Sequence, residues 1–159
     1  MLAAIGVVLM YLGSLVEVLD VSMAVLASLL CVIAVVEYGK AAPWLVYAVT
    51  SVIAVVLLPN KTPAVEYALF FGFYPILKEK FEKRKAPIAW LLKEITFNVS
   101  LVAVFFAFKL FMLGDINIPI PMYIVLAVAL EVVFVLYDLA LTKLISYYIY
   151  NLRKRFKLK

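Results

Sequence analysis

The sequence contains no histidine and a single cysteine, Cys31, among its 159 residues. The absence of histidine excludes histidine-ligated haem or zinc and acid–base catalysis by imidazole. One cysteine cannot form a disulfide within the chain. The sequence also lacks a phosphate-binding glycine loop, a Gly-x-Ser-x-Gly motif and an aspartate-rich phosphotransferase motif. We therefore expect a protein that is not an enzyme and that holds neither a metal nor another cofactor.

Charged residues are scarce and hydrophobic residues are abundant. Only 16% of the residues are charged, whereas 68% are hydrophobic, and the mean hydropathy is +1.13. Soluble domains are about 45–50% apolar, so a chain of this length has too little interior to bury such a content. The sequence predicts one all-α transmembrane domain over residues 1–159, in a multi-pass protein of the inner (cytoplasmic) cell membrane. Membrane lipids are then its first partners, and the net charge of +5 indicates no nucleic acid.

The densest block of charge inside the sequence is Lys78–Lys85, in which five of eight residues are basic. Short loops rich in Lys and Arg stay on the cytoplasmic side of a membrane. The basic tail from Arg153 to Lys159 then lies on the same side, and the turns that carry Asp20, Lys61 and Asp115 lie outside. This asymmetry predicts that both chain ends are inside.

Six apolar stretches predict six transmembrane helices. The first apolar run, Met1–Val36, would form a helix of about 54 Å, too long for a hydrocarbon core of about 30 Å. We therefore divide it at Val16–Asp20, and a five-helix interpretation without this break remains open. The expected spans are Leu2–Val16, Val21–Val36, Ala42–Leu58, Ala64–Leu77, Pro87–Leu113 and Met122 to about Tyr150.

Charged residues inside the last two spans are candidates for ion pairs, because buried charges are usually paired. Their depths match Glu94 with Lys143 and, less closely, Lys93 with Asp138. These pairs would hold the fifth and sixth spans together.

Glu131 differs from these residues, because it falls near the centre of the membrane. Such a carboxylate needs water, a proton or a cation. We therefore predict an outward-facing cavity between the fourth, fifth and sixth spans. Its polar lining would be Glu131 and Lys109, its walls Tyr67, Tyr74 and Phe105, and its rim Asn60 and Asp115. The alternative is a solid bundle in which Glu131 is protonated.

Small residues lie at helical spacing in the second span. Ala24 and Ser28 are separated by three residues, with Ala27 beside them. Such residues permit close helix contact in lipid, so they are candidates for contact with a partner subunit.

The layout of six short helices resembles the substrate-binding S component of energy-coupling-factor vitamin transporters. The segment Met23–Leu30, the turn at Gly39 and Lys40, and the apolar third span resemble the early part of that family. The resemblance implies a vitamin-like ligand near the outer face, between helices four to six and the first outer loop. It also implies a transmembrane coupling protein and ATPases as partner subunits.

Two alternatives remain open beside this interpretation. One is a membrane scaffold without a ligand, because the cell-shape protein MreD has a similar size and layout. The other is a proton-coupled carrier that uses Glu131.

The predicted orientation can be tested at Asn60, in the turn expected outside. In a Cys31→Ala background, an Asn60→Cys variant should react with a membrane-impermeant maleimide added to intact cells. Labelling that requires access from the cytoplasm would reverse the whole orientation.

Overall fold

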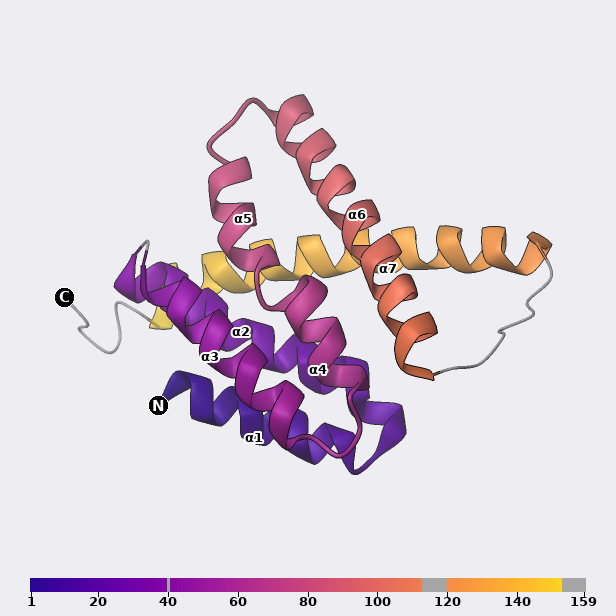
Figure 1. The fold of residues 1–159 in the computed structure, drawn as a ribbon. Coiled ribbons are helices and arrows are strands. Elements are labelled where there is room, and N and C mark those ends of the chain that lie inside the picture. The colour runs from indigo at the N-terminus through magenta and orange to yellow at the C-terminus, as the bar shows by residue number, and fades with distance from the viewer. Residues whose placement is uncertain (40, 113–119, 153–159) are drawn as a thin grey trace. The chain divides into compact units, whose positions relative to one another are not determined.

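The computed structural model describes residues 1–39, 41–112 and 120–152, and every regular element in these ranges is helical (Figure 1). This confirms the predicted all-α class. The α-helices are α1 (Leu2–Ser14), α2 (Asp20–Tyr38), α3 (Ala42–Leu57), α4 (Thr62–Glu66), α5 (Tyr74–Phe81), α6 (Ala86–Met112) and α7 (Ile120–Tyr147). A 3-10 turn, η1 (Glu17–Leu19), and two π-helical segments, η2 (Tyr67–Phe71) and η3 (Tyr148–Leu152), complete the described elements.

The chain divides into two compact units, Met1–Met112 and Leu113–Lys159. The first unit contains α1 to α6, and the described part of the second contains α7 and η3. The expectation of a single membrane domain stays a prediction.

Three helical stretches in the described residues are long and apolar enough to cross a membrane: Asp20–Tyr38, Ala86–Leu110 and Val125–Tyr150. The chain is therefore a helical membrane protein by the length and composition of its helices. Helices α1 and α3 are also apolar but have only 13 and 16 residues. The predicted count of six spans stays a prediction, as does the orientation. The predicted turn at 114–121 and the basic tail fall largely outside the described residues.

The first apolar run is broken where the sequence predicts. Helix α1 ends at Ser14, η1 follows, and α2 begins at Asp20. The returning helix comes very close to α1, because a Cβ atom added to Gly13 would lie 2.7 Å from the Cβ of Met23. Two separate helices therefore replace the single long one. At its other end α2 stops at Gly39, whose φ of +76° is readily adopted only by glycine.

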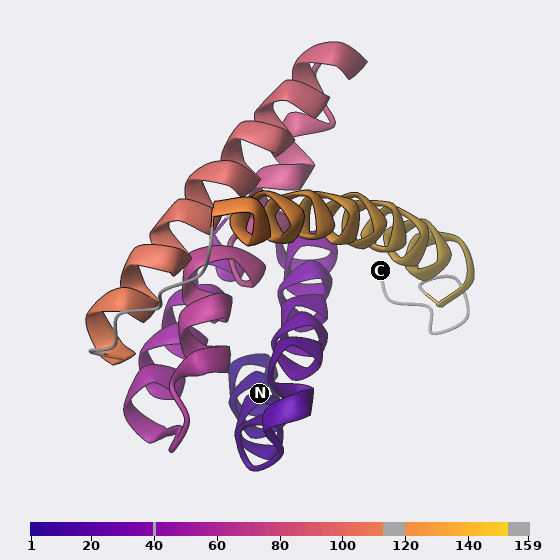
Figure 2. The same cartoon turned by 90° about the vertical axis from the view of Figure 1, so that its right-hand side faces the viewer.

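Helix α2 contacts α1, α3, α4, η2 and α5, and in Figure 2 it lies among the first helices of the chain. Its inner face is made of small residues. Ala24, Ala27 and Ser28 are at most 1% exposed, and Ala24 and Ala27 belong to the core cluster of the first unit. The structure thus places the residues expected to contact a partner subunit inside the chain's own bundle. Small side chains suit both roles, since either needs close backbone approach.

The predicted fourth span, Ala64–Leu77, is divided into α4, η2 and α5. The interruption falls at Gly72 and Phe73, just before Pro75 in the first turn of α5, where a missing N–H costs little. In η2 the N–H of Gly72 donates to the carbonyl of Tyr67, five residues earlier. The hydroxyl of Tyr47 donates to the carbonyl oxygen of Ala68 at 2.8 Å, which ties α3 to the π-segment.

The predicted loop Lys78–Lys85 is wrong in its first half, because α5 continues through Phe81. Helical spacing explains the extension, since it pairs Lys78 with Glu82 and Glu79 with Lys83, each four residues apart. The residues from Glu82 to Lys85 form the turn, and α6 begins at Ala86 with Pro87 in its first turn, close to the predicted start.

Gly72 provides the tightest test of this packing. A Cβ atom at this position would lie 2.6 Å from Cδ2 of Tyr47 and 2.7 Å from Cε1 of Tyr67. Replacing Gly72 by Ala should therefore destabilise the protein by about 1–3 kcal/mol through overpacking, measured by thermal unfolding in detergent. Gly6→Ala is the matched control, because its new methyl group would lie no closer than 3.2 Å to the Thr50 methyl and 3.5 Å to Cδ1 of Leu30. An equal or smaller loss for Gly72→Ala would contradict the described packing.

Candidate functional site

Three polar residues gather at one end of the first unit, and we call them the polar cluster: Asp20, Asn60 and Glu66. Asp20 is the first residue of α2, and Asn60 lies in the turn between α3 and α4. The side-chain amide of Asn60 donates to Oδ2 of Asp20 at 2.6 Å, and its oxygen accepts from the N–H of Thr62 at 3.0 Å. Asn60 thus fastens the turn that precedes α4 to the start of α2.

Glu66 ends α4, which packs against α2. Its carboxylate is close enough to that of Asp20 for the two charges to repel each other. Its Oε2 atom is buried and has no hydrogen-bond partner among the described residues. Asp20 itself is only 5% exposed. Two acidic groups therefore share a site that is largely shielded from solvent.

The basic residue nearest in sequence to this site does not neutralise it. The ammonium group of Lys61 donates to the carbonyl oxygens of Val55 at 2.9 Å and Leu58 at 2.7 Å. These contacts satisfy the C-terminal carbonyl groups of α3, where a cation is favourable. The cluster itself consists of two carboxylates and one amide, so its acceptors outnumber its donors, and such a set favours a proton or a cationic group.

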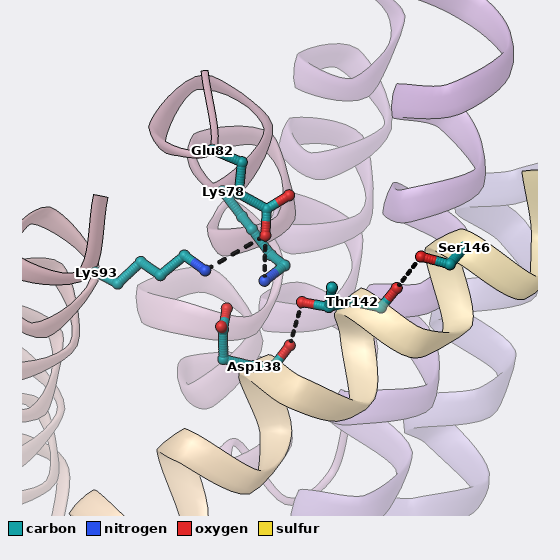
Figure 3. A network of polar contacts seen from close by, with 6 residues as sticks. All are labelled: Lys78, Glu82, Lys93, Asp138, Thr142 and Ser146. Carbon is teal, nitrogen blue, oxygen red and sulfur yellow. Dashed lines mark hydrogen bonds and ion pairs between the residues drawn. The ribbon is translucent and has the colours of Figure 1, made fainter. Parts of the chain in front are cut away.

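A second group, which we call the lysine pair cluster, lies where α5 meets α6: Lys78, Glu82 and Lys93. Oε1 of Glu82 is 2.7 Å from Nζ of Lys78 and 3.3 Å from Nζ of Lys93 (Figure 3). The side chain of Lys78 is fully buried and that of Lys93 is 6% exposed, whereas Glu82 is 41% exposed. One carboxylate group thus contacts two buried ammonium groups, which is an arrangement for holding helices together.

The residues predicted to form the cavity lie in different environments. Tyr67 and Tyr74 are fully buried in the first unit. Phe105 and Lys109 are exposed near the end of α6. Glu131 lies in α7 of the second unit, and Asp115 falls outside the described residues. A cavity that involves Glu131 therefore stays a prediction, and only Asn60 of the predicted set belongs to the polar cluster.

The predicted ion pairs between the fifth and sixth spans join residues of the two separate units. The pairing of Glu94 with Lys143 and of Lys93 with Asp138 therefore stays a prediction. Within the second unit, the hydroxyl of Thr142 donates to the main-chain oxygen of Asp138 at 2.9 Å (Figure 3). Ser146 repeats this bond one turn later, so these hydroxyl groups are satisfied by their own helix.

Five residues of these arrangements are not among the site residues that the sequence predicts: Asp20, Tyr47, Glu66, Lys78 and Glu82. Glu66 carried a usable signal, because it is an acidic residue two positions inside a predicted span. The sequence predicts Glu82 in a loop, and only the continuation of α5 to Phe81 brings it to a buried partner, Lys78. Tyr47 carried no signal, since its role depends on the π-segment η2.

No protein-family model, curated protein or solved structure matches this chain.

Loss of the carboxylate that the two lysines share should destabilise the protein. Replacing Glu82 by Gln leaves two buried ammonium groups with one carboxylate fewer, which should cost about 1–3 kcal/mol. Glu79→Gln is the matched control, because the Glu79–Lys83 pair is exposed and such pairs contribute roughly 0.3–0.5 kcal/mol. Thermal unfolding in detergent compares the two variants. Equal stability of both would show that Glu82 is not a structural partner.

Proposed function

We propose that this chain is the solute-binding membrane subunit of a multi-component uptake transporter, and that the polar cluster holds the charged group of the solute. The single observation that carries the proposal is the buried Oε2 atom of Glu66, which lacks a hydrogen-bond partner among the described residues, beside the buried carboxylate of Asp20. A carboxylate in such a place is costly unless a proton or a cation accompanies it.

The chemistry of the polar cluster favours a solute that carries a protonated amine or a similar cationic group. Two carboxylates offer acceptors only, and Asn60 already uses its amide on Asp20 and its oxygen on Thr62. An ammonium group would supply donors and charge to both acids. An anionic solute would add a third negative charge at the same place.

The position of the cluster supports binding in a membrane protein. Asp20 follows the first turn between apolar helices, and Asn60 lies in the second such turn at the same end of the unit. If the predicted orientation holds, this is the outer end, and the solute reaches the cluster from outside. Ligand sites commonly combine apolar walls with a few converging polar groups. A transmembrane coupling protein and ATPases would complete the transporter, as the resemblance to S components implies.

One observation favours the scaffold alternative. Tyr67 and Tyr74, which were expected to wall the cavity, are both fully buried in the first unit. A scaffold needs a solid bundle, and in it Glu66 would hold a proton.

Solute binding can be tested by thermal stabilisation of the purified full-length protein. The screen should use small solutes of similar size in three sets, which carry an ammonium, a hydroxyl or a carboxylate group. Solutes of the ammonium set should raise the unfolding temperature, because a ligand at about 100 times its Kd stabilises by roughly 2.7 kcal/mol. Glu66→Gln should remove this stabilisation, and Glu79→Gln, which changes an acid paired with Lys83, should keep it.

Each other outcome contradicts part of the proposal. Stabilisation that survives Glu66→Gln would place the solute elsewhere, and stabilisation by the carboxylate set alone would exclude a cationic solute. If none of the three sets stabilises the protein, the scaffold function becomes the better account.

A further inference from the structure

The chain has two tryptophans, Trp44 and Trp90, and both occupy the beginning of a helix. Trp44 lies in the first turn of α3, and Trp90 lies in the second turn of α6. Each is 39% exposed. Tryptophan is enriched at the membrane–water interface, where its ring lies among the lipid headgroups.

The ammonium group of a lysine lies over each tryptophan ring. Nζ of Lys80 lies 5.6 Å from the centroid of the Trp44 ring, and Nζ of Lys93 lies 5.1 Å from that of Trp90. Both distances are within the range of a cation–π interaction. Lys80 belongs to the last turn of α5, and α6 begins at Ala86. The two rings therefore mark the end of the first unit at which α5 turns into α6.

The same end exposes more positive than negative charge. Lys80, Lys83, Arg84 and Lys85 are all exposed. Of the two acidic residues in this stretch, Glu79 pairs with Lys83 and Glu82 pairs with Lys78 and Lys93. Within the described part of the chain, Lys80, Arg84 and Lys85 have no acidic partner. Three cations thus remain for a ligand.

We propose that this surface, formed by Trp44, Lys80, Arg84, Lys85 and Trp90, binds the headgroup of an anionic phospholipid. The cations contact the phosphate and the negative headgroup, and the two rings lie beside the glycerol region. Basic clusters next to a transmembrane helix attract anionic lipids, and the half-exposed rings place this cluster at headgroup depth. An acidic protein surface could pair with the cations but would not need the two rings at that depth. The proposal holds for either orientation and does not depend on the solute site.

The two tryptophans make a direct test possible without a label. The full-length protein is reconstituted into bilayers in which a minor fraction of the lipid carries bromine atoms near the headgroup, on either phosphatidylglycerol or phosphatidylcholine. Bromine quenches tryptophan fluorescence only at short range. Quenching by the brominated phosphatidylglycerol should exceed quenching by an equal fraction of brominated phosphatidylcholine. The excess should fall at high salt, because salt screens exposed charges.

Matched variants decide whether the unpaired cations cause the excess. A Lys80→Gln, Arg84→Gln, Lys85→Gln variant should reduce the excess quenching several-fold, whereas Lys61→Gln, at the polar end of the unit, should retain it. Quenching by brominated phosphatidylcholine must stay unchanged in both, which shows that the variants are folded and inserted. In the Trp44→Phe and Trp90→Phe variants, brominated phosphatidylglycerol should still quench the remaining tryptophan more strongly than brominated phosphatidylcholine does.

Two results would overturn the proposal. Equal quenching by both brominated lipids in the unchanged protein would show that the headgroup charge is not recognised and would leave the basic surface for an acidic protein partner. An excess that persists in the triple variant would show that lipid is recruited by other residues.

Discussion

The first unit depends on the close approach of α2 to its neighbours. Lipid is as apolar as the side chains it would replace, so helices in a membrane associate through packing and polar contacts. The inner face of α2 meets this constraint with small residues, and Ala24, Ala27, Ser28, Cys31 and Ala34 are at most 1% exposed. Gly13 of α1 lies against Met23 with no room for a methyl group. Bulkier residues here would separate the helices that bring Asp20 to Asn60.

The π-segment η2 is the second determinant of this arrangement. A π-turn leaves backbone groups out of the ordinary α-helical pattern and often marks a functional position. Tyr47 supplies a donor to the carbonyl of Ala68, and the rings of Tyr47 and Tyr67 occupy the space beside Gly72. Tyr67 is fully buried, so Glu66, one residue earlier, borders the core of the unit. The π-segment thereby joins the aromatic packing of the core to the acidic site.

Hydropathy and the positions of proline and glycine predicted where many of the helices begin and end along the chain. The break before Asp20, the start of α3 near Pro43 and the start of α6 near Pro87 all follow from local chain chemistry. The division of the fourth span into α4, η2 and α5 could not be predicted in detail, because a π-turn depends on partners such as Tyr47. The dense charge predicts a loop from Lys78 onward, but α5 extends to Phe81, because oppositely charged pairs four residues apart stabilise a helix.

The candidate site was predicted less well than the fold, because its residues are far apart in the sequence and one of them is buried by tertiary packing. Asn60 was expected at a rim, but its partner Asp20 lies 40 positions earlier in the chain, and hydropathy gives no sign of such a contact. The sequence predicts a functional role for Glu131, because the free-energy cost of an ionisable side chain inside a membrane span can be estimated from sequence. The cost of Glu66 arises instead from tertiary packing, which buries one of its oxygen atoms.

The packing also limits where the first unit can contribute to a solute site. Tyr67 and Tyr74 are enclosed, and Gly72 has its neighbouring space filled by two rings, so the region between α3 and η2 is occupied by the protein itself. The polar cluster lies beyond this region, next to the turns that join α1 to α2 and α3 to α4. In the proposed function, the solute would therefore be held at that end, where the protein offers two carboxylates and an amide that is already engaged. Because acceptors dominate there, the charge of the solute would then decide whether it is bound, since a buried acceptor without a donor is costly.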